Sequence, residues 1–138
     1  MTESDNRPTK TTVDSGTTWE ALAGYSRAVR YGNQIYISGT TATDEHGQVV
    51  GPGDVAAQAR YIIDKFERTL HQLGSSLDDV VRTRMYLRHI DQWEPAARVH
   101  GERFGAIRPA NTLVQALLVG EEYLVEMEAD ALIGAGKK

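Results

Sequence analysis

Alternating apolar and polar side chains predict two neighbouring strands near the C-terminus, at residues 111–118 and 124–131. Successive side chains of a strand point to opposite faces. We expect the core to receive Thr112, Val114, Ala116 and Leu118, together with Val125, Met127, Ala129 and Ala131. The opposite face then carries Asn111, Leu113, Gln115 and Leu117 beside the carboxylates of Glu126, Glu128 and Asp130. Because three carboxylates on one strand repel each other, this face is either solvated or part of a site or a subunit contact.

The first half of the chain predicts a hairpin followed by a long helix. Strands at residues 25–31 and 34–38 flank Gly32-Asn33, which suits a tight turn. Residues 40–53 are polar and glycine-rich and predict a loop. Asp54 is a suitable N-cap for a helix that runs to about Leu73. Its apolar residues recur at three- and four-residue steps, as expected of a helix that packs on a core: Val55, Ala59, Ile62, Ile63, Phe66, Leu70 and Leu73.

A further strand and helix are predicted in the second half of the chain. Residues 80–87 alternate, with Val81, Thr83, Met85 and Leu87 on one face and Val80, Arg82, Arg84 and Tyr86 on the other. Residues 92–104 predict a helix whose first turn accommodates Pro95. We expect the two helices to cover one face of the sheet, where Ile35, Val81, Val114 and Met127 lie.

The other face of the predicted sheet mixes tyrosine, leucine and charges of both signs. A monomer core would not accept unpaired charges, whereas a solvated face would carry fewer apolar side chains. Such a mixed face is typical of a subunit interface with polar pockets. We predict one domain at residues 19–133, a disordered segment at residues 1–18 and a loose tail at residues 134–138.

Composition narrows the function classes. A formal net charge of −4 argues against a nucleic-acid-binding surface. No apolar run is long enough to span a membrane, and residues 1–18 lack the apolar segment of a signal peptide. Without cysteine the chain has neither a disulfide nor a thiol nucleophile, which agrees with a cytoplasmic location.

The residue patterns of common catalytic centres are missing from the sequence. The histidines at positions 46, 71, 89 and 100 are scattered, without the spacing of metal ligands. His100-Gly101-Glu102 is similar to the H-x-E of zinc deaminases, but the cysteines of that site are missing. No phosphate-binding glycine loop and no G-x-S-x-G nucleophile turn is present. We therefore expect no metal and no organic cofactor.

Several short motifs occur in the order and spacing of one family. They are Tyr25-Ser26, Ile37-Ser38-Gly39, Asp79-Val80-Val81, Arg108-Pro109-Ala110 and Val125-Glu126-Met127-Glu128-Ala129. From about Gly24 to Leu132 the chain resembles the RidA/YjgF family of reactive-intermediate deaminases, also described as L-PSP endoribonuclease-like. The resemblance implies an α+β, chorismate-mutase-like fold, with a mixed sheet of about five or six strands and two helices on one face. It also implies a homotrimer with small-molecule clefts between subunits.

The resemblance also implies roles for individual residues. Glu126 matches the strand glutamate thought to position or activate the water that attacks an imine carbon. The alternative is that Glu126 only pairs with Arg82 or Arg84. Tyr25 matches a tyrosine near the cleft entrance or, alternatively, caps the hairpin. Three residues match the cleft wall or are ordinary strand and turn residues: Ser38, Gly39 and Thr112.

Asn111 occupies the position where the deaminases of this family carry an arginine that clamps a substrate carboxylate. A guanidinium offers a charged, planar fork, whereas asparagine offers one neutral donor group and one acceptor. The sequence therefore favours a ligand without a carboxylate. Arg84 is a candidate to replace the missing charge, and its alternative is an ion pair with Glu126 or Glu128.

Three functions follow from these observations. The first is a cofactor-free hydrolase that deaminates a small imine, enamine or related neutral metabolite. The second is a non-catalytic trimer that binds a small molecule. The third and least favoured is an RNA-cleaving or chaperone-like protein, against which the acidic balance argues.

Overall fold

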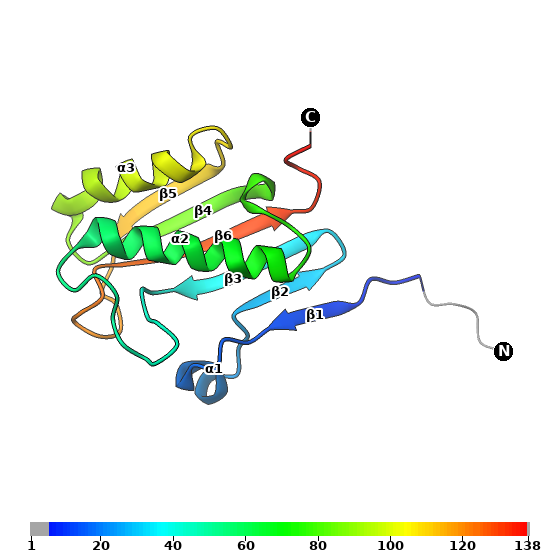
Figure 1. Cartoon of the computed structure of the whole chain (residues 1–138), viewed down its shortest axis with the longest axis horizontal. Helices are drawn as coiled ribbons and strands as arrows, with labels where there is room; N and C mark the ends of the chain where they lie inside the picture. Colours follow the sequence, from blue (N-terminus) through cyan, green and yellow to red (C-terminus); the bar gives the residue numbers. More distant parts are fainter. Residues whose placement is uncertain (1–5, 138) are drawn as a thin grey trace.

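A mixed six-stranded sheet forms the centre of the molecule, in the order β1-β2-β3-β6-β4-β5 (Figure 1). The structure is a computed structural model that describes residues 6–137. The elements are β1 Lys10–Val13, α1 Thr18–Ala23, β2 Ala28–Tyr31, β3 Gln34–Thr40, α2 Val55–Gln72, β4 Val80–Leu87, α3 Trp93–Phe104, β5 Ala110–Gln115 and β6 Val125–Leu132, with short 3-10 turns η1 Leu77–Asp79 and η2 Ile90–Gln92. Strands β4 and β5 pair in parallel, and the other neighbours pair antiparallel. The predicted α+β class is confirmed, with α2 and α3 on one face of the sheet (Figure 1).

Helix α2 forms where the apolar spacing predicts it. The Asp54 carboxylate accepts a hydrogen bond from the Ala57 amide at 3.0 Å and caps the helix. Ile62, Phe66 and Leu70 are fully buried against the sheet. Apolar side chains of this size contribute about 1.5–3 kcal/mol each when buried. The amphipathic stripe of α2 therefore fixes which side of the sheet becomes the core.

The central strands β4 and β6 present the predicted core residues. Met85 lies opposite Met127, and both are buried beneath the helices. Tyr86 lies opposite Glu126, and this pair points to the face that no helix covers. The polar side of β6 is thus the uncovered side, as expected.

Strand β5 differs from the prediction, because its two faces are exchanged. Leu113 pairs with Met85 and packs against the core, whereas Val114 pairs with Tyr86 and is 42% exposed. Both faces of β5 mix apolar and polar residues, so the sequence of this strand alone does not distinguish inside from outside. The parallel register with β4 decides the face instead.

A bulge at the start of β4 changes a second predicted core residue. The register with β6 shifts between Val80 and Arg82, and Val80 rather than Val81 is buried. A bulge adds one residue to a strand, so the alternation is reversed on either side of it.

The two ends of the chain are more ordered than predicted. Within residues 1–18, Lys10–Val13 form β1, which pairs with β2, and α1 begins at Thr18. In the C-terminal segment, the Gly134 and Gly136 amides donate hydrogen bonds to Asp79 Oδ1 at 3.2 and 3.0 Å. Backbone pairing accounts for the order at the N-terminus, and the Asp79 carboxylate accounts for it at the C-terminus. Residues 1–5 and 138 lie outside the described residues.

Candidate active site

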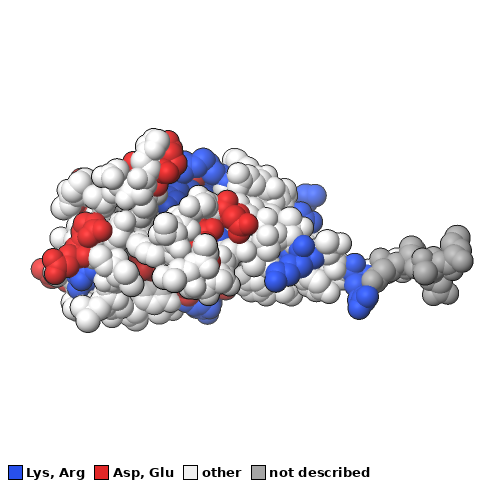
Figure 2. Space-filling model, turned by 90° about the horizontal axis from the view of Figure 1, so that it is seen from below, with Lys and Arg blue, Asp and Glu red and all other residues white. Residues whose placement is uncertain are grey.

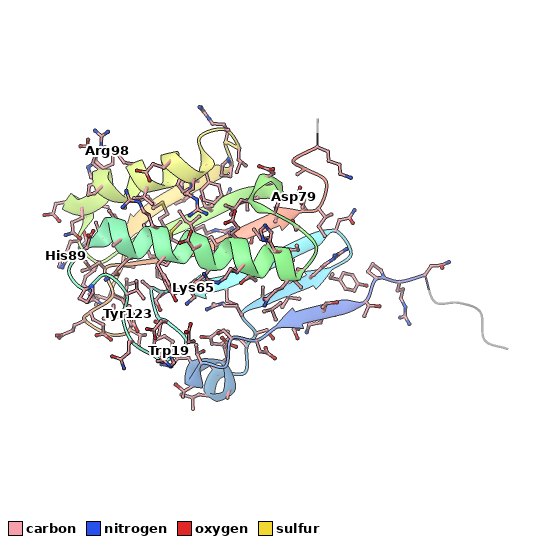
Figure 3. All side chains as sticks on the ribbon, viewed as in Figure 1. Trp19, Lys65, Asp79, His89, Arg98 and Tyr123 are labelled. Atoms are coloured by element: carbon pink, nitrogen blue, oxygen red, sulfur yellow. The ribbon has the colours of Figure 1, made fainter. Side chains whose placement is uncertain are left out.

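A cavity of about 270 Å³ lies between α1, α2 and the segment that follows β3. Trp19 and Lys65 line it, and Tyr123 packs edge-on against Trp19 with 6.2 Å between ring centroids. Figure 3 shows these three side chains in one corner of the molecule, away from Asp79 and Arg98. The complete lining is Thr17, Trp19, Leu22, Ala23, Tyr25, Arg27, Gly39, Thr41, Thr43, Lys65, Val119 and Glu126. The predicted site residues Tyr25, Gly39 and Glu126 therefore meet in one cavity.

Glu126 lies on β6 directly beside Gly39. A Cβ atom at position 39 would overlap with the Glu126 carboxylate, so only glycine leaves room for it there. Burial raises the pKa of the Glu126 carboxyl, and the positive charge of Arg27 partly opposes that rise. No side chain of residues 6–137 donates a hydrogen bond to this carboxylate. A half-buried carboxyl group in this state is suited to take up and release a proton.

The other acidic residues of β6 have structural partners. Arg84 Nη1 lies 3.4 Å from both Glu128 Oε1 and Asp130 Oδ2, and the Tyr86 hydroxyl donates to Glu128 at 2.8 Å. Arg84 therefore takes the ion-pair alternative with Glu128 and does not line the cavity. Glu128 and Asp130 are thus paired with Arg84, whereas Glu126 is not paired with it.

Arg27 and Lys65 belong to the cavity, although the sequence analysis did not select them. Arg27 is only 6% exposed, and burial lowers the pKa of its guanidinium. Lys65 donates hydrogen bonds to the carbonyl oxygens of Thr41 and Thr43 at 3.1 and 3.0 Å, and burial lowers its pKa to about 8. In the sequence, Lys65 directly precedes Phe66, which is buried on the apolar stripe of α2. This position was the one feature of the sequence that could have pointed to Lys65. No feature of the sequence pointed to Arg27.

Asn111 lies outside the cavity. Its Nδ2 donates a hydrogen bond to Thr83 Oγ1 at 2.9 Å, and Thr83 is fully buried on the helix-covered side of the sheet. In one chain Asn111 and Glu126 therefore lie on opposite faces, contrary to the prediction. Asn111 gives no reason to expect a neutral ligand in this cavity, whose wall contains two cationic side chains.

Ser38 and Thr112 are also absent from the cavity lining. The Ser38 hydroxyl donates to the Ser26 carbonyl at 2.7 Å, and its amide donates to the Arg27 carbonyl at 3.0 Å. Ser38 thus ties β3 to the segment that carries Arg27. Thr112 pairs with Arg84 in the β4–β5 register, on the uncovered face.

The described part of the chain has neither a metal-binding cluster nor a membrane-spanning helix. Residues 6–137 contain no group of three or more histidine, aspartate or glutamate side chains arranged to hold a metal ion. No helix in these residues has the length and apolar character needed to cross a bilayer. Independence from metal remains a prediction, which metal analysis of the purified protein would check.

The fold and the cavity define a small α+β protein in which a cavity with both charged and apolar walls lies beside a mixed sheet. The chain belongs to the YjgF/RidA family: the family model described as Endoribonuclease L-PSP matches residues 16–133. It is 36% identical over 110 residues to the 3-aminoacrylate deaminase RutC of Acinetobacter baylyi, covering 80% of this chain and 87% of that protein.

Solved structures agree with this assignment. A member of the YjgF/YER057c/UK114 family from Mycobacterium tuberculosis has a TM-score of 0.82 and 40% identity, covering 91% of this chain and all of that chain (100%). The YjgF gene product of E. coli has a TM-score of 0.76 and 26% identity, covering 90% of this chain and 98% of that chain.

The contact between Gly39 and Glu126 gives a testable prediction. Gly39→Ala should displace the Glu126 carboxylate and lower turnover or ligand binding at least tenfold, because the added methyl group occupies the position of the carboxylate. The matched control is Gly101→Ala on α3, where an added Cβ meets nothing within 4 Å and should stabilise the helix by about 0.5–1 kcal/mol. Steady-state kinetics and thermal unfolding of both variants would test this, and normal activity of Gly39→Ala would contradict it.

Proposed function

We propose that this protein hydrolyses the C=N bond of a small imine, or of the imine that forms from an enamine, in the cavity beside Glu126. The observation that carries the proposal is a half-buried carboxyl group on the cavity wall, with a raised pKa and no hydrogen-bond donor among residues 6–137. The similarity to a protein named 3-aminoacrylate deaminase supports the same class of reaction.

The chemistry of the reaction fits a single carboxylate. Hydrolysis adds water to the imine carbon, and the C–N bond breaks after the nitrogen has been protonated. The Glu126 carboxylate can accept a proton from the attacking water and pass it to the nitrogen, which gives a carbinolamine. It can then carry the proton of the new hydroxyl to the same nitrogen, so that the C–N bond breaks, ammonia leaves and a C=O bond forms. The proton balance closes on one residue, so this step assigns no role to a metal or an organic cofactor.

We also propose that the protein assembles as a homotrimer through the uncovered face of the sheet. Tyr36 is 49% exposed and Val114 is 42% exposed on this face, next to the ion pairs of Arg84. Large exposed apolar side chains among charged ones are typical of a protein interface. A cavity next to such an interface would gain a further wall from a second subunit.

Light scattering on the purified protein should give three times the chain mass of 15.2 kDa. Tyr36→Asp should shift the protein to smaller species, because it introduces a charge into the proposed contact. Trp93→Asp, which places the same change at an exposed position on α3, should leave the mass unchanged. A monomer mass for the unmodified protein at micromolar concentration would contradict the trimer.

A panel of imines generated in solution would test the proposed reaction by release of ammonia. Ligand binding without turnover of any imine would favour a non-catalytic binding protein instead. The surface gives little support for RNA cleavage: on the face drawn in Figure 2 the lysine and arginine side chains do not merge into one basic surface.

A further inference from the structure

The Arg27 guanidinium brings unmatched hydrogen-bond donors to the cavity wall. A guanidinium has five N–H donors. Among residues 6–137 its one acceptor is the Gly39 carbonyl oxygen, which lies 2.6 Å from Nη2, while the buried Nε has no partner. The nearby Glu20 carboxylate accepts hydrogen bonds from Ser15 and Thr17 instead. A buried cation without matched acceptors costs stability unless an anion joins it.

Lys65 places a second cation on the same cavity. An ammonium group has three donors, and Lys65 uses two of them for the Thr41 and Thr43 carbonyl oxygens. These two bonds hold the long side chain in one place on the cavity wall. No acceptor atom among residues 6–137 takes the third donor, so it can bind a ligand atom.

The two cations are held in place by one short segment of backbone. Arg27 binds the carbonyl oxygen of Gly39, and Lys65 binds the carbonyl oxygens two and four residues further along. The hydroxyls of Thr41 and Thr43 hydrogen-bond to each other at 2.9 Å, and Thr43 donates to the Tyr123 hydroxyl at 2.8 Å. The charged part of the wall is therefore held in place before any ligand enters, which lowers the cost of binding.

The charges on the cavity wall favour an anionic ligand. Arg27 and Lys65 are the cations, and Glu126 is the acid. Arg27 also lowers the pKa of Lys65, after the larger effect of burial, so the two positive charges repel each other. When Glu126 holds a proton, no anion on the cavity wall opposes the pair.

We propose that Arg27 and Lys65 bind the carboxylate of a short imine or enamine acid and direct its C=N bond toward Glu126. Two cationic donors can take one oxygen each, which is a strong and directional arrangement for a carboxylate. The inference rests on the proposed function, since it names the substrate class of the same site. It assigns carboxylate selection to Arg27, which directly precedes β2, and to Lys65 on α2, and not to Asn111 on β5.

Binding of unreactive ligands tests the pair without any turnover. Propionate and propionamide have nearly the same size, and only propionate is charged. Trp19 lines the cavity, and Trp93→Phe would leave it as the single tryptophan of the chain. Titration followed by Trp19 fluorescence should show propionate bound at least tenfold more tightly than propionamide.

Variants of Lys65 then separate a binding role from a structural one. Lys65→Met should weaken propionate binding roughly ten- to a hundredfold, as expected for the loss of one charge-assisted hydrogen bond, and leave propionamide binding unchanged. Lys65→Arg keeps the charge and should restore most of the loss. The matched control is Arg68→Met, which removes an exposed cation one turn further along α2 and should change neither affinity.

The outcomes separate the inference from the proposed function. Equal binding of the two ligands, or equal loss of both in a folded Lys65→Met protein, would overturn the carboxylate-binding pair. Preferential binding of propionate that depends on Lys65 would support the pair, even if no imine is turned over and the hydrolase proposal fails. If the carboxylate-binding pair and the hydrolase proposal are both correct, Lys65→Met should raise KM for a carboxylate-bearing imine and leave KM for an uncharged imine unchanged.

Discussion

Replacing Glu126 by glutamine is expected to lower imine turnover roughly 10²- to 10⁴-fold, the range for loss of a general acid–base group. Glutamine keeps the shape of the side chain beside Gly39 but cannot take up and return a proton. The assembly state should change little, and a carboxylate ligand should bind at least as tightly, because the substitution removes a negative charge beside Arg27 and Lys65. Ammonia release and light scattering on the same preparation would measure both effects.

The matched control for this substitution is Glu128→Gln, which removes a carboxylate from the same face of the same strand. It breaks an exposed ion pair with Arg84 and should leave turnover nearly intact, because such pairs contribute about 0–1 kcal/mol. Unchanged turnover in Glu126→Gln would rule out the proposed chemistry. Dissociation or unfolding of that variant would mean that Glu126 has a structural role.

The same substitution also has a predictable effect on stability as a function of pH. Burial raises the pKa of Glu126 above its ordinary value of 4.5, so the folded chain holds this proton more tightly than the unfolded chain. Stability from this group therefore falls as the pH rises from the ordinary to the raised pKa. Glu126→Gln should unfold at a slightly higher temperature than the unmodified protein at pH 7. The difference should vanish below pH 4.5, and thermal unfolding across this range would detect it.

Replacing Gln58 by alanine is expected to produce the largest loss of stability, about 3 kcal/mol or more. Gln58 is fully buried on α2, and its amide accepts from the Leu124 amide at 2.8 Å and donates to the Glu122 and Gly51 carbonyl oxygens at 3.0 and 3.2 Å. The substitution leaves the Leu124 amide and the Glu122 carbonyl oxygen without partners, whereas the Gly51 carbonyl oxygen keeps its bond from the Asp54 amide. Each unpartnered group costs about 1–3 kcal/mol when buried, and the cavity left by the side chain adds to this loss. Urea unfolding would measure the change.

This loss should also reach the cavity, because Gln58 fixes the segment between β5 and β6. That segment carries Val119 of the cavity wall and Tyr123, which binds Thr43. Gln72→Ala, at the exposed end of α2, should change stability by less than about 0.5 kcal/mol and serves as control. An equal effect of the two substitutions would show that the buried amide adds no stability of its own.

The elements whose apolar and polar residues fall on separate faces were predictable from the sequence. Helix α2 repeats apolar residues at helical spacing after a capping aspartate, and β6 alternates strictly between small or apolar residues and carboxylates. Burying the apolar side of each element is favourable in almost any arrangement, so the local pattern already determines the face. The resemblance to a known family led to Tyr25, Gly39 and Glu126, which the fold brings together in one cavity.

Other features depend on which distant segments meet, and only the tertiary structure decided them. Strand β5 has no apolar face of its own, so its parallel register with β4 turned Asn111 toward Thr83 and away from Glu126. Arg27 and Lys65 lie 38 positions apart, and each is an ordinary surface residue type. They line one cavity because the end of β3 offers a carbonyl oxygen to Arg27 and the segment after β3 offers two to Lys65. A pattern along the chain determines what an element buries, whereas pairing and packing determine which side chains share a site.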